Sequence, residues 1–396
     1  MTGHPADAMG AAPAPAGPRT VDGRGERDRV RVNELEAALV DHIATHGPIG
    51  FDDYVGHALY TPGHGFYTGG GGAGRRRDFL TSPEVGPLFG TVVANALDRW
   101  WDELGRPDPY RAVEAGAGPG GLARSVLAAG PACADALRPV LVERAEVQWD
   151  RHPEGVESRA SLPEPGGLGP GPVVVLANEL LDNLAFGLVE LTAEGWAEVV
   201  VDQAGGADPL HGAEGRAGGP ALVEAHRLLE PKRAAWCRGR AGRDAEVGTR
   251  MPVQAEAAGW LADAIDLAAG GRVVVLDYAS TSAELARRPW SEWVRTYAAH
   301  GRGGHPLADP GRCDITVEVA VDQLATVRPP DRDRSQAEFL ADHGIDALVA
   351  EGAERWRAAG AAGGLDAIAG RSRVGEAEAL TDRAGLGAFR VLEWIG

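Results

Sequence analysis

The sequence predicts an α/β fold with a doubly wound, mostly parallel sheet that carries helices on both faces. Short apolar runs of the buried-strand kind, at 172–177 and 272–277, alternate with segments whose apolar residues recur at helical spacing. A glycine-rich turn near residue 116 joins one predicted strand to the helix that follows it. Strands separated by helices form right-handed βαβ units, so these observations together indicate a doubly wound sheet.

The N-terminal part of the chain is expected to lie before this sheet. Residues 1–28 are rich in Ala, Pro, Gly and charge without periodicity, which is typical of a disordered tail. Residues 29–108 are expected to form a helical extension that also contains an aromatic, Gly-rich stretch. Its helices are predicted at 32–46 and 87–104, and the Gly-rich stretch lies at 51–79.

Residues 109–396 are expected to form the main domain, with an irregular insertion at about 203–250 where glycine and charge dominate. Its strands are predicted at 110–115, 139–143, 172–177, 196–201, 272–277 and 389–394. Its helices are predicted at 120–129 and 254–269, with shorter ones near 290–300, 335–353 and 376–384. The later helices and the last strand form a C-terminal elaboration of the sheet.

The charge balance argues against a nucleic-acid partner. The chain carries 39 Lys and Arg against 57 Asp and Glu, which gives a formal net charge of −18. An acidic chain gains no counterion release on DNA or RNA, so no broad nucleic-acid surface is expected. The charge suits small cationic ligands or basic peptide segments, and it also serves solubility alone.

Cysteine usage and hydropathy indicate a cytoplasmic location. The three cysteines, Cys133, Cys237 and Cys313, are far apart and odd in number, so neither a disulfide framework nor a zinc site is expected. No apolar run of about 18 residues is present, so membrane insertion is not expected. The N-terminus also lacks the basic start and apolar stretch of a secretory signal.

The segment AVEAGAGPGGLARSVL, residues 112–127, carries the sharpest local signal. A predicted strand runs into Gly116, Gly118 and Gly120, and a helix begins directly after them. Glycines are needed because the turn is tight and a ligand would lie against bare backbone at the helix N-terminus. The next strand ends at Glu143, whose carboxylate can accept hydrogen bonds from both ribose hydroxyls of an adenosine.

Two cofactors fit this segment. Gly116-x-Gly118-x-x-Gly121 satisfies the dinucleotide fingerprint. Glu114, followed by glycines at every second position through Gly120, satisfies the S-adenosylmethionine (SAM) pattern, in which the acid helps to fix the loop and the methionine amino end. Dinucleotide folds usually carry an apolar residue at that position, and they often begin with this strand. The sequence therefore favours SAM, with an NAD-dependent oxidoreductase and a ligand-free turn as alternatives.

The segment PVVVLANELLD, residues 172–182, delivers polar side chains to the same edge of the sheet. Asn178, Glu179 and Asp182 follow an apolar strand at its carboxyl end, where open α/β sheets bind ligands. Methyl transfer is an in-line displacement, so an enzyme mainly positions the nucleophile and matches charge. Glu179 and Asp182 are therefore candidate catalytic residues for a cationic acceptor such as a guanidinium, and Asn178 is a candidate cofactor ligand. Alternatively, Asn178 is a helix N-cap and the acids serve the first turn.

The chain resembles the MidA family of class I SAM-dependent methyltransferases, which includes the mitochondrial arginine methyltransferase needed for respiratory complex I assembly. The likeness covers roughly residues 32–396. It is carried by GPIGFDDYVGHALYTPGHGFY (47–67), DFLTSPEVGPLFG (78–90), VEAGAGPGGL (113–122), ANELLD (177–182), VLDYA (275–279), CDITVEVAVDQLA (313–325), SQAEFLADHGI (335–345) and FRVLEW (389–394).

The resemblance implies a Rossmann-like class I methyltransferase sheet, SAM as cofactor and an arginine side chain of a protein substrate as acceptor. It also makes Tyr60, Ser82, Pro83 and Glu84 candidates for closing over the cofactor or the substrate. Independently of the family, the run TSPE that begins at Thr81 predicts a helix start with Ser82 as N-cap and Pro83 at the first helical position.

Several positions depart from the family pattern. Residues 183–185 (NLA) stand where the family usually has Ala-x-Pro, and Ala279 replaces the glycine of a DYG motif. Ala117 and Pro119 replace the commoner Pro and Arg between the glycines. No glycine or acid that the cofactor needs is lost, so SAM binding is a firmer expectation than arginine specificity. A non-catalytic assembly or interaction factor that binds SAM structurally is the alternative.

Overall fold

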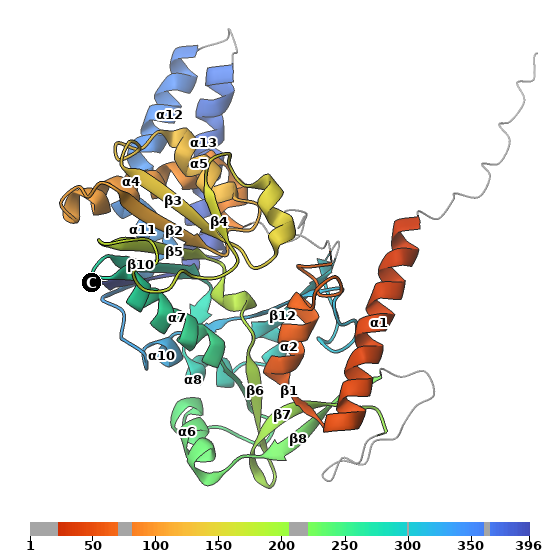
Figure 1. The fold of residues 1–396 in the computed structure, drawn as a ribbon. Coiled ribbons are helices and arrows are strands. Elements are labelled where there is room, and N and C mark those ends of the chain that lie inside the picture. Colours follow the sequence, from red (N-terminus) through yellow and green to blue (C-terminus); the bar gives the residue numbers. More distant parts are fainter. Residues whose placement is uncertain (1–22, 70–80, 206–220, 299–300, 360–364) are drawn as a thin grey trace, which may run out of the picture.

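The computed structural model describes residues 23–69, 81–205, 221–298, 301–359 and 365–396 of the chain. Figure 1 shows a seven-stranded sheet in the upper half of the molecule and a five-stranded sheet in the lower half. Helices α12 (Ile345–Ala359) and α13 (Leu365–Thr381) form a hairpin that projects from the upper half. Helix α1 (Gly23–His46) flanks the lower half.

The seven-stranded sheet has the doubly wound order that the sequence predicts. Its strands follow the order β16-β17-β10-β5-β2-β3-β4. Their bounds are β2 (Tyr110–Ala115), β3 (Leu137–Val142), β4 (Glu157–Arg159), β5 (Val173–Asn178), β10 (Arg272–Asp277), β16 (Arg332–Ser335) and β17 (Arg390–Ile395). The strands from β4 to β10 are parallel, and β17 is antiparallel to both of its neighbours. The order reverses between β2 and β5, where sheets of this kind bind ligands at their carboxyl ends.

Side chains of β5 alternate between two cores on opposite faces of this sheet. Val174 and Leu176 join the core that includes α4, α5, α11 and α13, whereas Val173 and Val175 join the core that includes α7 and α10. The bounds of these helices are α4 (Pro87–Glu103), α5 (Gly121–Ala129), α11 (Gln336–Asp342), α7 (Ala255–Ala268) and α10 (Val321–Leu324). Burial on both faces explains the unbroken apolar run of the strand.

The five-stranded sheet joins the N-terminal extension to the segment after β5. Its order is β1-β7-β6-β9, with β8 paired to β7. The bounds are β1 (Ile49–Gly50), β6 (Gly187–Thr192), β7 (Gly195–Gln203), β8 (Leu222–Leu228) and β9 (Arg250–Val253). Helices α1 and α2 (Phe51–Tyr60) share one core with this sheet, which includes Leu39, Phe186 and Val199. The extension is therefore part of a unit built with residues far along the chain.

The expectation of an irregular insertion at 203–250 is wrong for its described part. Strand β8 pairs with β7 in antiparallel register, and helix α6 (Pro231–Ala241) follows it. Only three of the 11 residues of this helix are buried, so its apolar stripe is narrow and the charged residues around it conceal the helical pattern. Residues 206–220 lie outside the described residues.

The expected N-terminal tail is also shorter than the sequence indicates. Helix α1 begins at Gly23, so residues 23–28 are helical, and residues 1–22 lie outside the described part of the chain. The mean hydropathy of α1 is low, and its first turns therefore lack the apolar periodicity by which helices are recognised.

A helix is expected from the sequence near 290–300, but the structure differs. Helix α9 (Trp290–Trp293) is a single turn, and strand β12 (Val294–Ala298) follows it and pairs with β14 (Asp314–Val317). A tertiary pairing of this kind overrides the local pattern. The remaining short elements are α3 (Ser82–Val85), η1 (Glu146–Arg151), η2 (Leu181–Asn183), β11 (Ala279–Ser280), α8 (Ser282–Ala286), β13 (Gly301–Arg302), β15 (Val319–Ala320) and η4 (Leu386–Ala388).

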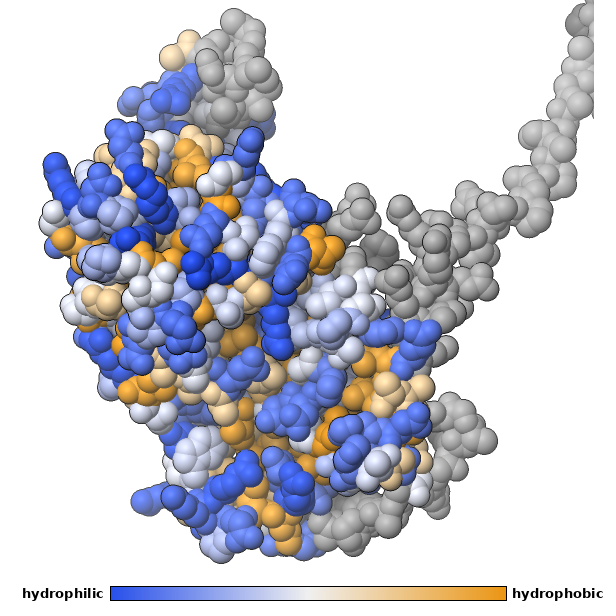
Figure 2. Space-filling model, in the orientation of Figure 1, coloured by the Kyte–Doolittle hydropathy of each residue, from blue (hydrophilic) through white to orange (hydrophobic). Residues whose placement is uncertain are grey.

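Hydrophilic residues cover most of the face shown in Figure 2, and apolar residues are visible there in separate small patches. This agrees with a chain whose charged residues make up 24% of the sequence. Within the described ranges, no helix combines the length and the apolar character that crossing a bilayer requires.

Candidate functional site

A cavity of about 660 Å³ opens at the carboxyl ends of β2, β3 and β5. Its lining includes the glycine loop after β2, Glu143 after β3, and Asn178 and Glu179 at the end of β5, and it is called the sheet-edge cavity below. It lies beside the reversal of strand order, and its volume is typical of a site that buries a cofactor.

The glycine loop requires its glycines for two different reasons. Gly116, Gly118 and Gly120 all have positive φ, of 71°, 50° and 72°. A Cβ at Gly116 would meet the Leu180 side chain at 3.0 Å, and one at Gly120 would meet Pro153 at 3.1 Å. Gly116 and Gly118 line the cavity, whereas Gly120 is buried behind the loop. Gly120 therefore shapes the turn, and the first two glycines leave bare backbone for a ligand.

Glu143 connects the end of β3 to this loop. Its Oε2 accepts a hydrogen bond from the backbone N–H of Gly118 at 2.8 Å, and its Oε1 accepts one from Ala145 at 2.7 Å. Burial raises the pKa of Glu143, and these two hydrogen bonds partly oppose the rise. Each carboxylate oxygen keeps a further lone pair, so Glu143 can also accept from the two ribose hydroxyls for which the sequence proposes it.

His152 holds the loop from behind, and sequence reasoning missed it. Its Nε2 lies 2.8 Å from the carbonyl oxygen of Gly118, and its Nδ1 lies 2.7 Å from the hydroxyl of Ser158. The residue belongs to no motif and lies 34 positions after the glycine that it contacts. A loop histidine of this kind carries no sequence signal, because its role depends on the return of the chain after β3.

Glu114 lies below the loop and lines the cavity. Burial raises the pKa of its carboxyl group to about 8, and a hydrogen bond from the backbone of Ala123 and the charge of Arg124 only partly oppose this. A carboxyl group with a raised pKa is stabilised in its charged form by a nearby cation. The position predicted for the methionine amino end therefore suits a ligand that carries an ammonium group.

Asn178 ends β5 with one polar atom unsatisfied. Its Nδ2 donates to Glu179 Oε1 at 3.2 Å, but its Oδ1 is buried and has no hydrogen-bond partner among the described residues. A buried acceptor without a donor costs free energy, so a ligand that donates at this point would remove the cost. The prediction that Asn178 is a helix N-cap is wrong, because the following turn η2 begins at Leu181 with Leu180 as its cap.

Glu179 adopts a backbone conformation that non-glycine residues rarely adopt. Its φ is 52°, and its N–H donates to the carbonyl oxygen of Leu276 at 2.8 Å, which fixes the turn. Its Oε1 accepts from the backbone N–H of Ser82 and from Asn178, each at 3.2 Å. A left-handed L-residue costs about 1–2 kcal/mol, and such residues cluster at functional sites. The strained turn directs the carboxylate of Glu179 to the cavity wall.

Asp182 does not line the sheet-edge cavity. It is 4% exposed in η2, and its N–H and that of Leu181 donate to Asp277 Oδ2 at 3.3 and 3.0 Å. Burial raises the pKa of Asp277 well above its usual value, and the charges of Asp182 and Glu179 add to this. Because η2 is a 3₁₀ turn that begins after Glu179, the two acids do not lie on one face of an α-helix. The catalytic role of Asp182 remains a prediction.

The lid candidates come from the N-terminal extension. Tyr60, Pro83 and Glu84 line the cavity, whereas Ser82 is fully buried and its hydroxyl donates to Gln336 Oε1 at 2.9 Å. The prediction of Ser82 as N-cap is wrong. Thr81 is the N-cap, and its N–H donates to Glu84 Oε2 at 3.3 Å in a capping box. Ser82 and Pro83 therefore occupy the first two helical positions, and the Ser82 side chain is free for a tertiary contact.

A second group of functional candidates consists of Tyr60, which is already named from the sequence, and of Tyr67, Asn183 and Asp314, which are not proposed there as site residues. The hydroxyl of Tyr67 lies 2.8 Å from both Asn183 Oδ1 and Asp314 Oδ1, and Asn183 Nδ2 donates to Asp314 at 3.4 Å. Tyr60 stacks on Tyr67 at 5.5 Å between ring centroids, and its hydroxyl donates to the backbone of Asn183 at 3.3 Å. This network joins three segments of the chain beside the cavity.

The lining of the sheet-edge cavity is strongly acidic. Its carboxylates are Glu84, Glu114, Glu143, Glu164, Glu179, Glu256 and Asp263. Within the described lining, Arg144 is the one cationic side chain. SAM carries a sulfonium and an ammonium group, so the charge of the cavity, the acceptor Asn178 Oδ1 and the bare glycine backbone all fit it.

Comparison with known proteins agrees with this geometry. A protein-family model described as "Putative S-adenosyl-L-methionine-dependent methyltransferase" matches residues 92–330. Among solved structures, a protein from Burkholderia thailandensis bound to S-adenosyl-homocysteine is 26% identical, with a TM-score of 0.74, and the match covers 98% of this chain and 95% of that one. A native crystal structure from the same organism is also 26% identical, with a TM-score of 0.76 and the same coverage.

Curated relatives carry the name protein arginine methyltransferase NDUFAF7. The zebrafish (Danio rerio) protein is 24% identical over 361 residues, which cover 80% of this chain and 79% of that protein. The mouse (Mus musculus) protein is 23% identical over 392 residues, which cover 87% and 83%. A fruit-fly (Drosophila melanogaster) homologue is 40% identical over 93 residues, which span 24% of this chain and 21% of that protein. The cofactor is therefore SAM, and the NAD-dependent and ligand-free alternatives are wrong.

Proposed function

Because the chain belongs to this family of S-adenosyl-L-methionine-dependent methyltransferases, we propose that its acceptor is a guanidinium nitrogen of an arginine side chain in a protein substrate. Bound SAM supplies a methyl group made electrophilic by the adjacent sulfonium. The residues of the chain then have to hold the guanidinium in line with that methyl group and exclude competing water.

The observation that carries the proposal is the placement of Glu179. Its carboxylate stands at the carboxyl end of β5, and hydrogen bonds from Ser82 and Asn178 fix its Oε1. A guanidinium presents parallel N–H groups that pair well with a carboxylate, and such pairing orients the acceptor. The strained φ of 52° at Glu179 supports a functional reason for a charged residue where glycine would be easier.

Two further observations support an arginine acceptor. The sheet-edge cavity has an excess of carboxylates, which favours a cationic acceptor over a neutral one. Relatives from zebrafish and mouse, which match most of the chain, are named protein arginine methyltransferases. These names support the class of acceptor, and the identity of the protein substrate is left to experiment.

The test is methyl transfer from labelled SAM to arginine-containing peptides, with the modified residue identified by mass spectrometry. Glu179→Gln keeps the size of the side chain, so turnover should fall by about 100-fold while the affinity for S-adenosylhomocysteine stays within about twofold. Glu146→Gln, at an exposed acid outside the cavity lining, should change neither. Methylation of lysine or of an N-terminus, or full activity in Glu179→Gln, would contradict the proposal.

A second candidate is an assembly or interaction factor that binds SAM as a structural ligand. The segment 183–185, which departs from the family pattern, and the position of Asp182 outside the cavity lining favour it. This candidate predicts cofactor binding without turnover on any acceptor. It also predicts that Glu179→Gln fully restores function in a deletion strain, an outcome that methyl transfer through Glu179 does not allow.

We further propose that the protein works in the cytoplasm, which is a reducing compartment. All three cysteines are free and buried. Burial raises the pKa of Cys133 and Cys313 to about 12, so both thiols stay protonated and unreactive. Recovery of the protein from a secreted or membrane fraction of the source cells would contradict this location.

A further inference from the structure

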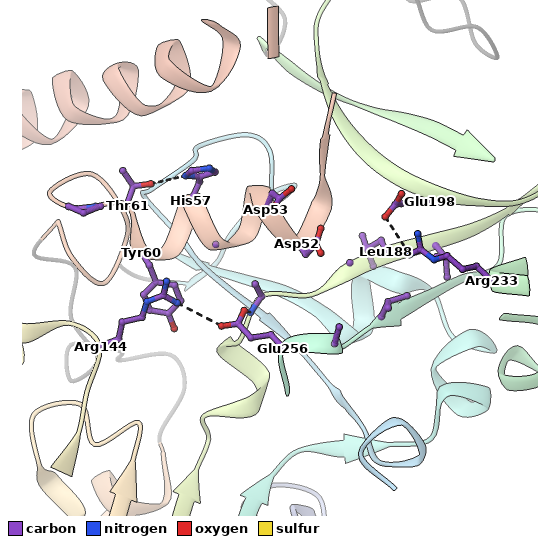
Figure 3. A pocket seen from close by; sticks show the side chains of 17 residues that line it. Asp52, Asp53, His57, Tyr60, Thr61, Arg144, Leu188, Glu198, Arg233 and Glu256 are labelled. Atoms are coloured by element: carbon purple, nitrogen blue, oxygen red, sulfur yellow. Dashed lines mark hydrogen bonds and ion pairs between the residues drawn. The ribbon is translucent and has the colours of Figure 1, made fainter. Parts of the chain in front are cut away.

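A second cavity of about 600 Å³ lies between helix α2 and strands β6 and β9. It is called the side cavity below, and its lining includes Asp52, Asp53 and Gly56 of α2, Leu188 of β6 and Val253 of β9. Figure 3 shows the pair of Glu198 and Arg233 at one end and the group of Tyr60, Arg144 and Glu256 at the other. A cavity of this volume is large enough to hold several side chains of a bound peptide.

The two cavities adjoin each other. Tyr60, Arg144 and Glu256 line both of them. The guanidinium of Arg144 lies 4.3 Å from the ring centroid of Tyr60 and 3.8 Å from a carboxylate oxygen of Glu256. The other oxygen of Glu256 accepts from the backbone N–H of Ala185 at 3.0 Å. These three side chains therefore form a bridge at the junction between the sheet-edge cavity and the side cavity.

This bridge can open at little cost. The side chains of Arg144 and Glu256 are 58% and 41% exposed, and their closest N···O distance is long for an ion pair. Exposed pairs of this kind contribute little to stability, because water screens both charges. Once Arg144 moves away, a cation that enters from the side cavity could take its place over the face of Tyr60 and beside the carboxylate of Glu256.

The acids of the side cavity differ in whether they have partners. Glu198 is paired with Arg227 at 2.7 Å and with Arg233 at 3.6 Å. Asp52 and Asp53 are exposed, and their side chains make no hydrogen bond or ion pair with another described residue. Two unpaired carboxylates on one wall of the cavity favour an occupant with positive charge.

We propose that the side cavity binds the segment of the protein substrate that flanks the methylated residue, with a basic side chain of that segment paired to Asp52 and Asp53. The inference rests on the proposed function, because it assumes a polypeptide acceptor. An extended segment seated between α2 and β6 would carry its acceptor side chain past the bridge into the sheet-edge cavity. The net charge of −18 would attract the same basic segment over a longer distance.

Binding is tested apart from chemistry, with the full-length protein saturated with S-adenosylhomocysteine. The probe is a fluorescein-labelled nonapeptide that has a central arginine and two flanking lysines, and its affinity is read from fluorescence anisotropy. The double variant Asp52→Asn/Asp53→Asn should weaken binding by about tenfold, because two exposed charge pairs are lost. Asp346→Asn is the matched control, since Asp346 is also an exposed acid in the first turn of a helix but lines neither cavity.

A second variant fills the cavity without a change of charge. Gly56 lies within α2, and a Cβ there would meet no atom within 4 Å, so Gly56→Leu should fold and keep its cofactor affinity. Peptide binding should fall by at least about tenfold, because the leucine occupies the side cavity. Gly375→Leu is the matched control, because Gly375 lies within α13 with the same open space and lines neither cavity.

The outcomes separate this inference from the proposed function. Peptide binding that depends on Asp52, Asp53 and Gly56 but leads to no methyl transfer supports the inference and contradicts the proposed function. Arginine methylation with unchanged peptide affinity in both variants supports the proposed function and contradicts the inference about the side cavity. Two more results overturn the inference, namely equal binding of a nonapeptide whose lysines are replaced by glutamates, and no peptide binding by the wild-type protein.

Discussion

Half-buried carboxylates lie in two regions of this molecule, and their surroundings differ. In the sheet-edge cavity, burial raises the pKa of Glu114 to about 8 and also raises that of Glu143. In the five-stranded sheet, burial alone would raise the pKa of Glu224, but hydrogen bonds from His305 and Arg250 outweigh it and lower the pKa to about 2. Burial thus favours the neutral form of Glu114 and Glu143 in one region, whereas Glu224 is firmly ionised in the other.

The difference follows from where the cations lie. Arg250, with a side chain 12% exposed, donates to Glu224 at 2.6 Å and to Glu190 at 2.7 Å. His226 and His305 each lie 3.2 Å from one of these glutamates, and together the five residues are called the Arg250 cluster. The cluster pairs its carboxylates with its own cations, whereas Glu114 and Glu143 in the cavity form no salt bridge with another described residue. Two acids with raised pKa values therefore stand where a cationic ligand can bind.

The largest expected effect comes from a substitution in the glycine loop of the sheet-edge cavity. Gly116→Ala places a Cβ at positive φ, 3.0 Å from the Leu180 side chain, and should weaken S-adenosylhomocysteine binding by about 100-fold in calorimetry. Gly259→Ala is the control, since a Cβ there would meet no atom within 4 Å and Gly259 does not line the cavity. It should bind within about twofold of wild type. Equal losses in both variants would mean that the turn does not depend on left-handed backbone.

The next effect breaks the Arg250 cluster. Arg250→Met removes the shared cation from two half-buried carboxylates, so the free energy of unfolding in urea should fall by about 2–3 kcal/mol. Arg227→Ala removes a cation from a pair whose arginine is 60% exposed and should cost less than about 1 kcal/mol. Cofactor affinity of the folded protein should not change in either variant. A small cost for Arg250→Met would show that the cluster is not what stabilises this sheet.

A third measurement sharpens the comparison through pH. An acid whose pKa is higher in the folded state than in the unfolded state binds more protons when the protein is folded. For Glu114, the resulting stabilisation is lost as the pH rises from the pKa of the unfolded state towards about 8, its pKa in the folded state. Glu224, with a pKa near 2, contributes no slope in that window. Glu114→Gln should therefore reduce the fall in stability between pH 5.5 and pH 8, measured by urea unfolding. An unchanged slope would show that Glu114 is already ionised at pH 5.5.

The smallest effect concerns the network beside the cavity. Tyr67→Phe removes the hydroxyl that contacts Asn183 and Asp314 and should cost about 1 kcal/mol of stability while it raises the KM for the acceptor. Tyr110→Phe removes a buried hydroxyl that donates to the carbonyl oxygen of Leu97 at 3.1 Å, so it should cost a similar amount of stability. Its acceptor KM should not move. A shift of KM in both variants would point to a general loss of rigidity.

The cofactor half of the site could be predicted because its signals are local. Glu114 and the glycines that follow it occupy one strand–turn–helix segment, and the turn chemistry that they serve depends only on neighbouring residues. Glu143 and Asn178 could also be placed, because parallel strands end at a common edge. The doubly wound, mostly parallel sheet followed from the alternation of apolar runs with helical segments, whereas the order of its strands comes from the structure.

The other half could not be predicted, because it is assembled from distant segments. Asn183 contacts Tyr67, 116 positions earlier, and Asp314, 131 positions later. The local sequence pattern of one segment does not indicate which other two segments it contacts. The charged residues of helix α6 obscured its helical pattern in the sequence. The position of Asp182 depends on a turn whose type the sequence does not specify. Local rules describe how a segment folds, but not which remote segment completes a polar network.

The position of His152 has a consequence for how the cofactor binds. The carbonyl oxygen of Gly118 can only accept, so the Nε2 of His152 must carry the proton, and a neutral ring then accepts from Ser158 at Nδ1. This hydrogen bond fixes the tautomer of the neutral ring, and the ring braces the glycine loop against the segment that follows β3. Because Glu143 and His152 both hold Gly118, part of the conformational entropy of the glycine loop is lost during folding, and less of it is left to be lost when a ligand binds.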